Sequence, residues 1–303
     1  MTPTVTVIIG TFNRAGLLRE AIKSVLGQTY EHWELLVVDN GSTDDTKATV
    51  RSFDDARIRY IRNPKPTGSC AAPRNLGTGL ASGDYIAFLD DDDVWYPDKL
   101  QVCVKELQAH PEAILVCHAL KMVNGSSASI RRFGPWSQDM YERLLYEGNL
   151  LGPGGMVIKK EALVRAGGFN IQEEYLGCDD YELWIRLARN RVLFHFIDDV
   201  LAEFRVTGSN GCLADPYHSV RLAAMVKTHI MLFEGQSVLS PRGKGRIALL
   251  SLLVLRRLLG SGNWRDAAPF IRELVRCGRP GLRRIGAELG SQLKSRVLGC
   301  FLA

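Results

Sequence analysis

The first 120 residues of the chain alternate between two hydrophobic periods, and this alternation limits the folds that they can adopt. Short β-branched runs show little polar alternation, as expected for strands that a parallel sheet buries on both faces. Amphipathic patterns with a helical period separate these runs. The order predicts a doubly wound α/β domain, with a mostly parallel sheet flanked by helices. The predicted strands span 5–9, 35–38, 58–61, 85–89 and 114–117, and the predicted helices cover 17–26, about 74–81, and segments that begin near 43 and 97.

The rest of the chain changes from mixed to helical patterns. Residues 121–150 contain glycine and proline breakers, which predict a loop-rich segment. Beyond Pro216 the pattern is helical. We therefore predict an α/β domain over 1–215, divided near residue 120 into two halves, and a helical region over 216–303. The further predicted strands are 156–158 and 192–197, and the further predicted helices are 180–189 and about 216–234, 242–259, 264–277 and 282–298.

The apolar runs and the cysteine spacing indicate the cellular compartment in which to expect the protein. The amino terminus has no basic leader before its short apolar stretch, and the longest near-continuous apolar run, 247–255, is far shorter than the ~20 residues that span a bilayer. The seven cysteines are odd in number, widely spaced and without a C-x-x-C pair, which argues against a disulfide framework and against a zinc site. We expect a protein of the reducing cytoplasm without a transmembrane helix.

The net charge of +5 hides an asymmetry between the two parts of the chain. Residues 242–303 contain 13 Lys and Arg against 3 Asp and Glu, which leaves 25 against 30 for residues 1–241. The two parts therefore carry +10 and −5. The basic helices either attach to an anionic membrane surface or pack on the α/β domain with solvated arginines. Nucleic-acid binding is disfavoured, because the basic residues lack interleaved exposed aromatic side chains.

Polar residues follow the predicted strands where an open parallel sheet binds its ligands, at the carboxyl ends. Their hydroxyl, amide and carboxylate groups suit a base and ribose together with a cation. They are Thr11, Asn13 and Arg14 after the first strand, Asp39, Asn40 and Ser42 after the second, and Asp90, Asp91, Asp92 and Asp93 after the fourth.

The four consecutive aspartates at 90–93 need a counter-ion, because close like charges repel and raise one another's pKa. Their hard oxygen ligands suit Mg²⁺ or Mn²⁺, which take one or two carboxylates together with substrate phosphates. An alternative is that Asp93 caps the helix predicted from Pro97. An EF-hand is excluded, since Trp95 and Gln101 occupy the positions that require Gly and Glu.

Other nucleotide and metal motifs are absent from the sequence. No G-x-G-x-x-G follows the first strand, and no G-x-x-x-x-G-K-[ST] occurs, which disfavours a dehydrogenase and a P-loop protein. The six histidines form no H-E-x-x-H motif and no tight pair, so they are expected to be ordinary surface or core residues.

Six stretches in consistent order resemble glycosyltransferase family 2, a large inverting family. They span about two thirds of the chain, and the ordered set is far more specific than any single stretch. The resemblance implies the GT-A fold, a Rossmann-like α/β architecture, and a nucleotide-sugar donor. The stretches are VTVIIGTFNR (5–14), LLVVDNGSTDDT (35–46), RNLGTGLASGDYIAFLDDDDVWYPDKL (74–100), GGF (167–169), DDYELWIRL (179–187) and LAEFRVTGSN (201–210).

The resemblance assigns donor-site roles to the residues after the strands. Asp39 would accept a hydrogen bond from the base, usually uracil in this family, Arg74 would lie near the diphosphate, and Asp91 would reach the ribose. Asp90 and Asp92 match the outer positions of the D-x-D signature, with Asp92 the direct ligand of a Mn²⁺ or Mg²⁺ ion that stabilises the departing nucleotide. The full implied nucleotide pocket comprises Thr11, Asn13, Arg14, Asp39, Asn40, Arg74 and Asp91.

The resemblance also implies a general base, because Asp179 and Asp180 fall where the family has Glu-Asp. Asp180 would take the proton of the acceptor hydroxyl, and Asp179 would support it. The start of a helix would help to keep Asp180 ionised. Alternatively, Asp179 and Glu182 form a capping box.

The acceptor side is assigned to Gly154, Gly155 and Trp184. The glycines of the 152–155 segment would let backbone approach a sugar closely, although a simple turn would use the same residues. Two departures from the family stand out: Thr207 replaces a common histidine, which leaves a third protein contribution to the metal open, and Pro73 precedes Arg74.

We therefore expect a metal-assisted, inverting transfer from a UDP-sugar to a hydroxyl of a glycan or lipid-linked saccharide, in bacterial surface polysaccharide synthesis at the inner face of the membrane. One alternative is a haloacid-dehalogenase-like phosphatase, because Asp90, Asp92 and Val94 fit its D-x-D-x-[TV] motif, although that motif normally follows the first core strand. Another alternative is a non-catalytic sugar-nucleotide-binding protein.

Overall fold

The computed structural model describes residues 4–207, 215, 217–235, 239–260 and 264–277. The chain divides into two compact units, residues 1–210 and 211–303. The fourth predicted tail helix, 282–298, lies outside the described residues.

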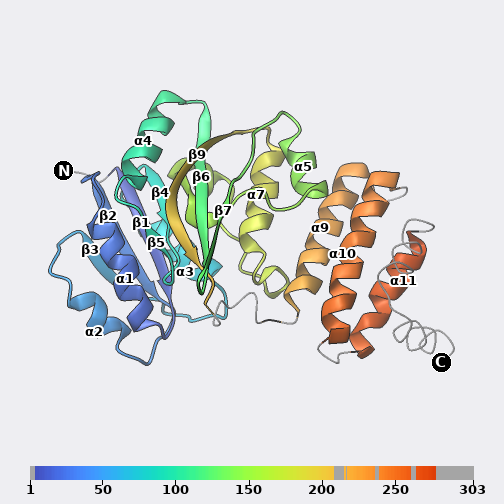
Figure 1. Ribbon diagram of the computed structural model, residues 1–303, viewed down its shortest axis with the longest axis horizontal. Helices are drawn as coiled ribbons and strands as arrows, with labels where there is room; N and C mark the ends of the chain where they lie inside the picture. The colour runs from blue at the N-terminus through green and yellow to red at the C-terminus, as the bar shows by residue number, and fades with distance from the viewer. Residues whose placement is uncertain (1–3, 208–214, 216, 236–238, 261–263, 278–303) are drawn as a thin grey trace. The chain divides into compact units, whose positions relative to one another are not determined.

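The first unit is built on one nine-stranded sheet, with the order β3-β2-β1-β4-β8-β6-β9-β5 and β7 paired to β6 (Figure 1). Strands β1 to β4 pair in parallel, and β6 pairs in parallel with β9. Strand β8 runs antiparallel between β4 and β6 and so joins the two halves of the sheet. The strands are β1 Val5–Thr11, β2 Trp33–Asp39, β3 Ile58–Arg62, β4 Tyr85–Phe88, β5 Val94–Trp95, β6 Ala113–Asn124, β7 Ser127–Arg131, β8 Met156–Lys159 and β9 Leu193–Arg205.

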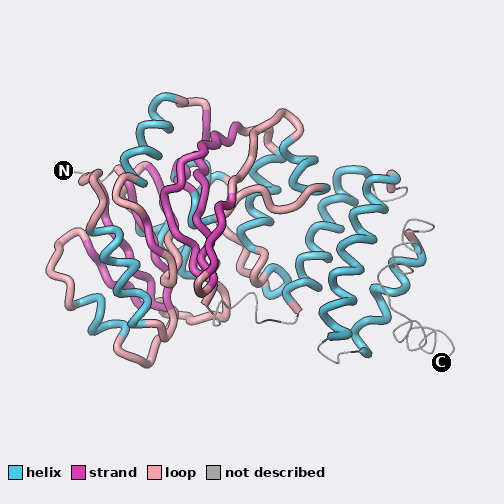
Figure 2. Tube along the Cα trace, in the orientation of Figure 1, coloured by secondary structure: helices cyan, strands magenta, loops and turns pink. Residues whose placement is uncertain are grey.

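Helices cover the sheet, which confirms the predicted α/β fold (Figure 2). The loop prediction for 121–150 is wrong in part, because β6 continues to Asn124 and forms a hairpin with β7. Gly125, at φ +56°, marks the tight turn of that hairpin rather than the end of ordered structure. The helices are α1 Ala15–Leu26, α2 Thr46–Arg51, α3 Ala71–Leu80, α4 Lys99–Ala109, α5 Met140–Tyr146, α6 Lys160–Arg165 and α7 Asp179–Arg189, with 3₁₀ turns η1 Pro153–Gly155 and η2 Glu173–Tyr175.

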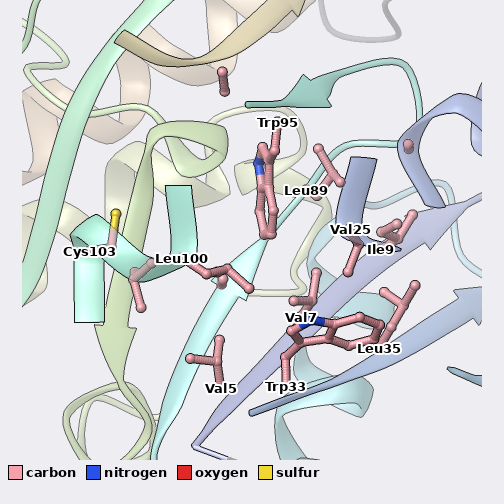
Figure 3. Packing of buried hydrophobic residues seen from close by; sticks show 14 of the residues in the cluster. Val5, Val7, Ile9, Val25, Trp33, Leu35, Leu89, Trp95, Leu100 and Cys103 are labelled. Atoms are coloured by element: carbon pink, nitrogen blue, oxygen red, sulfur yellow. The ribbon is translucent and has the colours of Figure 1, made fainter. Parts of the chain in front are cut away.

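The central strand β1 is buried on both faces, which explains its lack of polar alternation. Val5, Val7 and Ile9 join the cluster that α1 and α4 contribute to on one face (Figure 3). Ile8 points to the other face, where a Cβ on Gly77 of α3 would lie 2.7 Å from its Cγ2. The absence of a side chain at Gly77 therefore lets α3 pack closely on β1, which brings the helix that carries Arg74 close to the sheet.

The described residues of the second unit form three helices and a 3₁₀ turn, in which α9 and α11 both pack against α10. Lys227 Nζ lies 2.7 Å from Glu273 Oε2 and links α9 to α11. Val226, Val254 and Leu274 are buried. Among the described residues, none of the helices is both long and apolar enough to cross a bilayer. The elements are α9 His218–Glu234, α10 Pro241–Gly260, η3 Trp264–Ala267 and α11 Ala268–Arg276.

Candidate active site

The four aspartates 90–93 lie directly after β4, at the carboxyl end of the parallel half of the sheet. Sheet pairing continues to Leu89, whose N–H donates to Ile8 O at 3.1 Å. The N–H of Asp93 then donates to Asp90 O at 3.1 Å and closes a turn over the quartet. This turn lets the four side chains reach different partners.

Asp91 and Asp92 share one arginine from the loop after β1. Arg14 Nη1 lies 3.0 Å from Asp91 Oδ1 and 3.0 Å from Asp92 Oδ2. The Thr11 hydroxyl donates to the second oxygen of Asp91 at 2.7 Å, and the Thr207 hydroxyl donates to Asp92 at 3.3 Å. These contacts nevertheless do not fully offset the cost of burying the two carboxylates in their charged form. Burial raises the pKa of Asp91 to about 6, and burial together with the charge of Asp90 raises that of Asp92.

Arg74 connects the quartet to Asp179, the residue before the predicted base. Its Nη2 donates to Asp90 Oδ1 at 2.8 Å, and its Nη1 lies 3.5 Å from Asp179 Oδ2. The guanidinium also lies 5.4 Å from the centre of the Phe169 ring and 5.9 Å from that of Phe88. Desolvation opposes the charge of this arginine, but the neighbouring carboxylates raise its pKa, so Arg74 remains a buried cation.

Asp93 does not cap the helix that it was predicted to cap. Helix α4 begins at Lys99 and its N-cap residue is Asp98, so that alternative is wrong. Asp93 instead accepts the N–H of Arg205 from β9 at 2.9 Å. Burial, followed by the charge of Asp90, raises the pKa of Asp93 to about 9, so its carboxyl is protonated at neutral pH.

Asp179 and Asp180 are the first two residues of α7. The N-cap residue is Cys178, and the Glu182 carboxylate accepts two hydrogen bonds from Arg186, at 2.7 and 2.8 Å. The capping-box alternative for Asp179 is therefore wrong. Burial raises the pKa of Asp179 to about 6 and also raises the pKa of the partly exposed Asp180, although the positive charge of Arg74 works against both shifts.

Asp39, at the end of β2, is buried and surrounded by donors from its own chain. Its Oδ1 accepts the N–H groups of Gly41 at 3.0 Å and Ser42 at 2.7 Å. Its Oδ2 accepts the Tyr60 hydroxyl and lies 3.3 Å from Arg62 Nη1. Burial alone would raise the pKa of Asp39, but the bonds from Tyr60, Ser42 and Gly41 outweigh it and hold that pKa below its usual range.

Sequence reasoning did not find Tyr60 and Arg62. The signal was available in the strand order, because parallel pairing places Arg62 of β3 beside Asp39 of β2. A tyrosine and an arginine at the carboxyl end of the edge strand β3 were the residue types to notice. The same reasoning could not anticipate the bond from the Arg205 backbone to Asp93, which depends on the path of β9.

The remaining nucleotide-side residues hold the strand-end loops together. Asn13, at φ +53°, accepts the N–H of Thr43 at 2.8 Å, and its own N–H donates to Ser42 Oγ at 2.9 Å. Asn40 donates its backbone N–H to Thr11 O at 2.8 Å. The loops after β1 and β2 therefore form one connected rim.

The residues assigned to the acceptor side lie in two settings. Gly154 and Gly155 form η1, where a Cβ on Gly154 would lie 3.4 Å from Asp93 Oδ2 and one on Gly155 would lie 2.9 Å from His118 O. Gly154 therefore borders the quartet, whereas Gly155 lets the backbone approach β6. Trp184 is fully buried and packs edge-on against Phe169 at 6.4 Å, so it supports the site from the core and does not contact an acceptor directly.

A divalent cation fits this donor set through Asp90 and Asp92. The two carboxylates are close enough for the charge of Asp90 to raise the pKa of Asp92, which is the strain that a bound cation relieves. Two carboxylates with phosphate oxygens make a sufficient magnesium or manganese site. Thr207 supplies a hydroxyl beside Asp92 where many family members have an imidazole.

Comparisons with known proteins agree with the order of these motifs. A family model described as Glycosyl transferase family 2 matches residues 6–165. A protein of Rickettsia felis named "Uncharacterized glycosyltransferase" is 33% identical over 218 residues, which make up 70% of this chain and 34% of that relative. The Escherichia coli protein named UDP-Glc:alpha-D-GlcNAc-diphosphoundecaprenol beta-1,3-glucosyltransferase WfgD is 30% identical over 61% of this chain and 70% of its own length. The chain thus spans only about a third of the Rickettsia felis relative.

A solved structure supports the same fold. The mannosyltransferase PcManGT from Pyrobaculum calidifontis, in complex with GDP-Man and Mn²⁺, has a TM-score of 0.57 and 21% identity, over 95% of this chain and 79% of that chain. At this identity the likeness concerns the fold alone, and it confirms the predicted GT-A architecture.

Proposed function

The chain belongs to glycosyl transferase family 2 and is a glycosyltransferase, and from this membership we propose that it transfers a sugar from a UDP-sugar to a hydroxyl of a glycan or lipid-linked saccharide. The activity in the name of WfgD, with UDP-Glc as donor and a diphosphoundecaprenol-linked acceptor, supports this choice of substrates. The observation that carries the proposal is the buried Arg74, which contacts Asp90 on the donor side and Asp179 beside the base. The family membership gives no support to a phosphatase.

The nucleotide lies, in this proposal, along the rim formed by the loops after β1 and β2. Thr11, Asn13, Arg14 and Asn40 line that rim. Asp39 accepts the N–H of the uracil after giving up its contact with Arg62, whose side chain is 55% exposed and free to move outward. Asp91 lies between Thr11 and Arg14 and faces the ribose.

Asp90 and Asp92 hold a Mn²⁺ or Mg²⁺ ion, which supplies charge neutralisation for the diphosphate. Arg14 and Arg74 place two fixed positive charges on the same carboxylates, so the chain itself balances part of the negative charge of the quartet. Arg74 remains charged because it is buried against carboxylates, and this suits it to stabilise the leaving nucleotide.

Asp180 is the general base. As the acceptor oxygen forms a bond to the anomeric carbon, its proton moves to the Asp180 carboxylate. The bond from that carbon to the diphosphate breaks, and its electron pair leaves with the nucleoside diphosphate. Attack from the face opposite the leaving group inverts the anomeric centre. Asp179, held by Arg74, fixes the first turn of α7 and thereby the position of Asp180.

The second unit attaches the enzyme to an anionic membrane surface, where a lipid-linked acceptor would reside. Arg242, Leu249, Leu253 and Arg256 are all exposed and recur at helical spacing on α10, so that apolar and basic side chains share one stripe. Salt-sensitive sedimentation with anionic liposomes is the expected result. Binding to neutral and anionic liposomes alike, or to neither at low salt, would contradict attachment by charge.

The experiment that tests the function is UDP release from a panel of UDP-sugars, measured with and without Mn²⁺ and with candidate lipid-linked acceptors. We expect one UDP-sugar to be turned over in a cation-dependent and acceptor-dependent way. Turnover of a generic phosphate ester, or binding of UDP-sugars with no transfer to any acceptor, would favour the phosphatase or the non-catalytic alternative.

A further inference from the structure

A second cluster of metal-binding side chains lies outside the active site, at the start of β9. Glu106 and His110 lie one helical turn apart, on the last turn of α4 and just beyond it, and His195 lies on β9. Ligand atoms of these three residues all lie within 4.8 Å of one another. Within the described part of the chain, the quartet at 90–93 forms no such group of three.

The two imidazoles converge on one carboxylate oxygen. His195 Nε2 lies 3.0 Å from Glu106 Oε2, and His110 Nε2 lies 3.8 Å from the same oxygen. The two rings stack with their centres 4.1 Å apart and their planes at 29°. Ligands at ~2.0–2.1 Å from a tetrahedral zinc ion lie roughly 3.4 Å from one another, so shifts on the order of 1 Å would complete the geometry.

A fourth residue is placed to orient one of these ligands. His110 Nδ1 lies 3.5 Å from Glu112 Oε1, on the side of the ring away from Glu106. A metal-binding imidazole usually donates its other N–H to a carboxylate, which fixes its tautomer, and Glu112 lies within ion-pair distance of that nitrogen. The side chains of Glu106, His110 and His195 are 28%, 40% and 23% exposed, so an ion can reach them from solvent.

We propose that Glu106, His110 and His195 bind one zinc-like divalent cation, with water in the fourth position. Two imidazoles and one carboxylate favour Zn²⁺, Ni²⁺ or Cu²⁺ over the hard ions Mg²⁺ and Mn²⁺. This site therefore differs in chemistry from the oxygen-only donor set of Asp90 and Asp92.

The position of the cluster indicates a structural role for the cation. Residue 195 precedes Arg205, whose N–H binds Asp93, by ten positions on β9. At about 3.3 Å per strand residue, the cluster lies roughly 30 Å along β9 from the quartet. A bound ion would fasten the end of α4 to β9 without touching the donor, so its loss would lower stability and leave transfer intact.

Sequence patterns could not reveal this cluster. The absence of C-x-x-C pairs argues only against sites with thiolate ligands. His110 and His195 are 85 positions apart, so no local motif joins them. The expectation that the histidines form no tight pair is wrong for these two, because the parallel pairing of β6 with β9 brings His195 next to the end of α4.

The test is titration of chelator-treated, full-length protein with Zn²⁺ alone, followed by calorimetry and by melting temperature. We expect one equivalent to bind and to raise the melting temperature, and we expect H195Q and H110Q each to weaken binding at least tenfold. H32Q, which alters an exposed histidine beside Tyr30, is the matched control and should bind as wild type does. Substitution of Co²⁺ reports on the ligands, because nitrogen and oxygen donors give d–d bands without a sulfur charge-transfer band.

Three outcomes would overturn the proposal: no Zn²⁺ binding by wild type, binding by H195Q and H110Q as tight as that by wild type, or a sulfur charge-transfer band that assigns the metal to cysteines. Melting temperatures of the variants without metal show whether they fold. Transferase activity of H195Q should equal that of wild type, so failure of this site leaves the proposed function untouched.

Discussion

Asp39 and the quartet at 90–93 lie at the carboxyl ends of β2 and β4, the parallel strands on either side of β1, yet the surroundings of Asp39 and of Asp91, Asp92 and Asp93 shift the pKa values in opposite directions. Donors from Gly41, Ser42, Tyr60 and Arg62 surround Asp39, and its pKa is lowered. Asp91, Asp92 and Asp93 of the quartet have raised pKa values instead. The chain therefore supplies Asp39 with enough hydrogen-bond donors of its own, but it supplies too little positive charge to Asp91, Asp92 and Asp93.

This difference separates a carboxylate that the chain supplies with hydrogen-bond donors from carboxylates that need further positive charge from a ligand. A satisfied carboxylate stabilises the loops that it binds. Under-compensated carboxylates cost stability, and a structure retains them where something else neutralises them, as at functional sites. In our account, that partner is a divalent cation with a sugar-bearing diphosphate.

The largest expected effect is on catalysis, at Asp180. D180N should lower kcat by about 10²- to 10⁴-fold, because an amide cannot take the acceptor proton. Binding of the UDP-sugar with Mn²⁺ should persist. D45N, at an exposed position before α2, is the control and should keep full activity. Initial rates of UDP release check this, and near-normal turnover by D180N would remove Asp180 as the base.

The next effect is on stability and contrasts Asp39 with Asp93. D39N should lower the free energy of unfolding by about 2–4 kcal/mol, because it replaces an acceptor of several hydrogen bonds with a group that presents donors of its own. D93N should raise it, because an amide resembles the protonated carboxyl of folded Asp93 but requires no proton uptake on folding at pH 7. Urea unfolding at pH 7 measures both, and a larger loss for D93N than for D39N would reverse the assignment.

A smaller effect concerns pH. A carboxyl whose folded pKa is raised contributes stability that is present below its unfolded pKa and is lost as the pH rises through the folded value. For Asp93 this window extends from about 4 to about 9. Wild type should therefore lose stability relative to D93N as the pH rises from 6 to 8.5, by at most ~1.4 kcal/mol per pH unit.

Asp39 provides the opposite control for that measurement. Its lowered pKa contributes stability that is present above its unfolded value and is lost only as the pH falls through the folded value. The stability difference between wild type and D39N should therefore stay constant between pH 6 and 8.5. Parallel curves for wild type and D93N over the same range would show that the Asp93 carboxyl is not held protonated.

The parallel half of the fold was predictable because its strands are short and apolar, and because β1, β2 and most of β4 are buried, so that local pattern and tertiary role agree. Prediction was weaker past residue 120. Gly125 marks a turn inside the β6–β7 hairpin, but the same residue in a polar segment is typical of a loop. Strand β8 lies antiparallel between β4 and β6, but the hydrophobic pattern of its four residues indicates neither its direction nor its neighbours.

The candidate site was predictable in its residue types and not in their pairing. Asp39, Asp90 and Asp180 stand out because they follow strands or begin a helix. The bridge from Arg74 to Asp179 joins positions 105 residues apart, and the bond between Arg205 and Asp93 uses a backbone group that carries no sequence signal. Trp184 looked like a sugar-contacting aromatic, but its position on α7 directs it into the core.

The central claim is that the quartet takes up a cation together with the donor diphosphate, and proton release tests it most directly. D180N protein, in which turnover should be slow, is titrated calorimetrically with a UDP-sugar plus Mn²⁺ at pH 6. Repeating the titration in buffers of different ionisation enthalpy gives the number of protons released on binding. Because the pKa of Asp91 is raised to about 6 and that of Asp92 is also raised, binding of the cation should expel protons and should require Mn²⁺. Equal affinity without Mn²⁺, together with no proton release, would contradict the account.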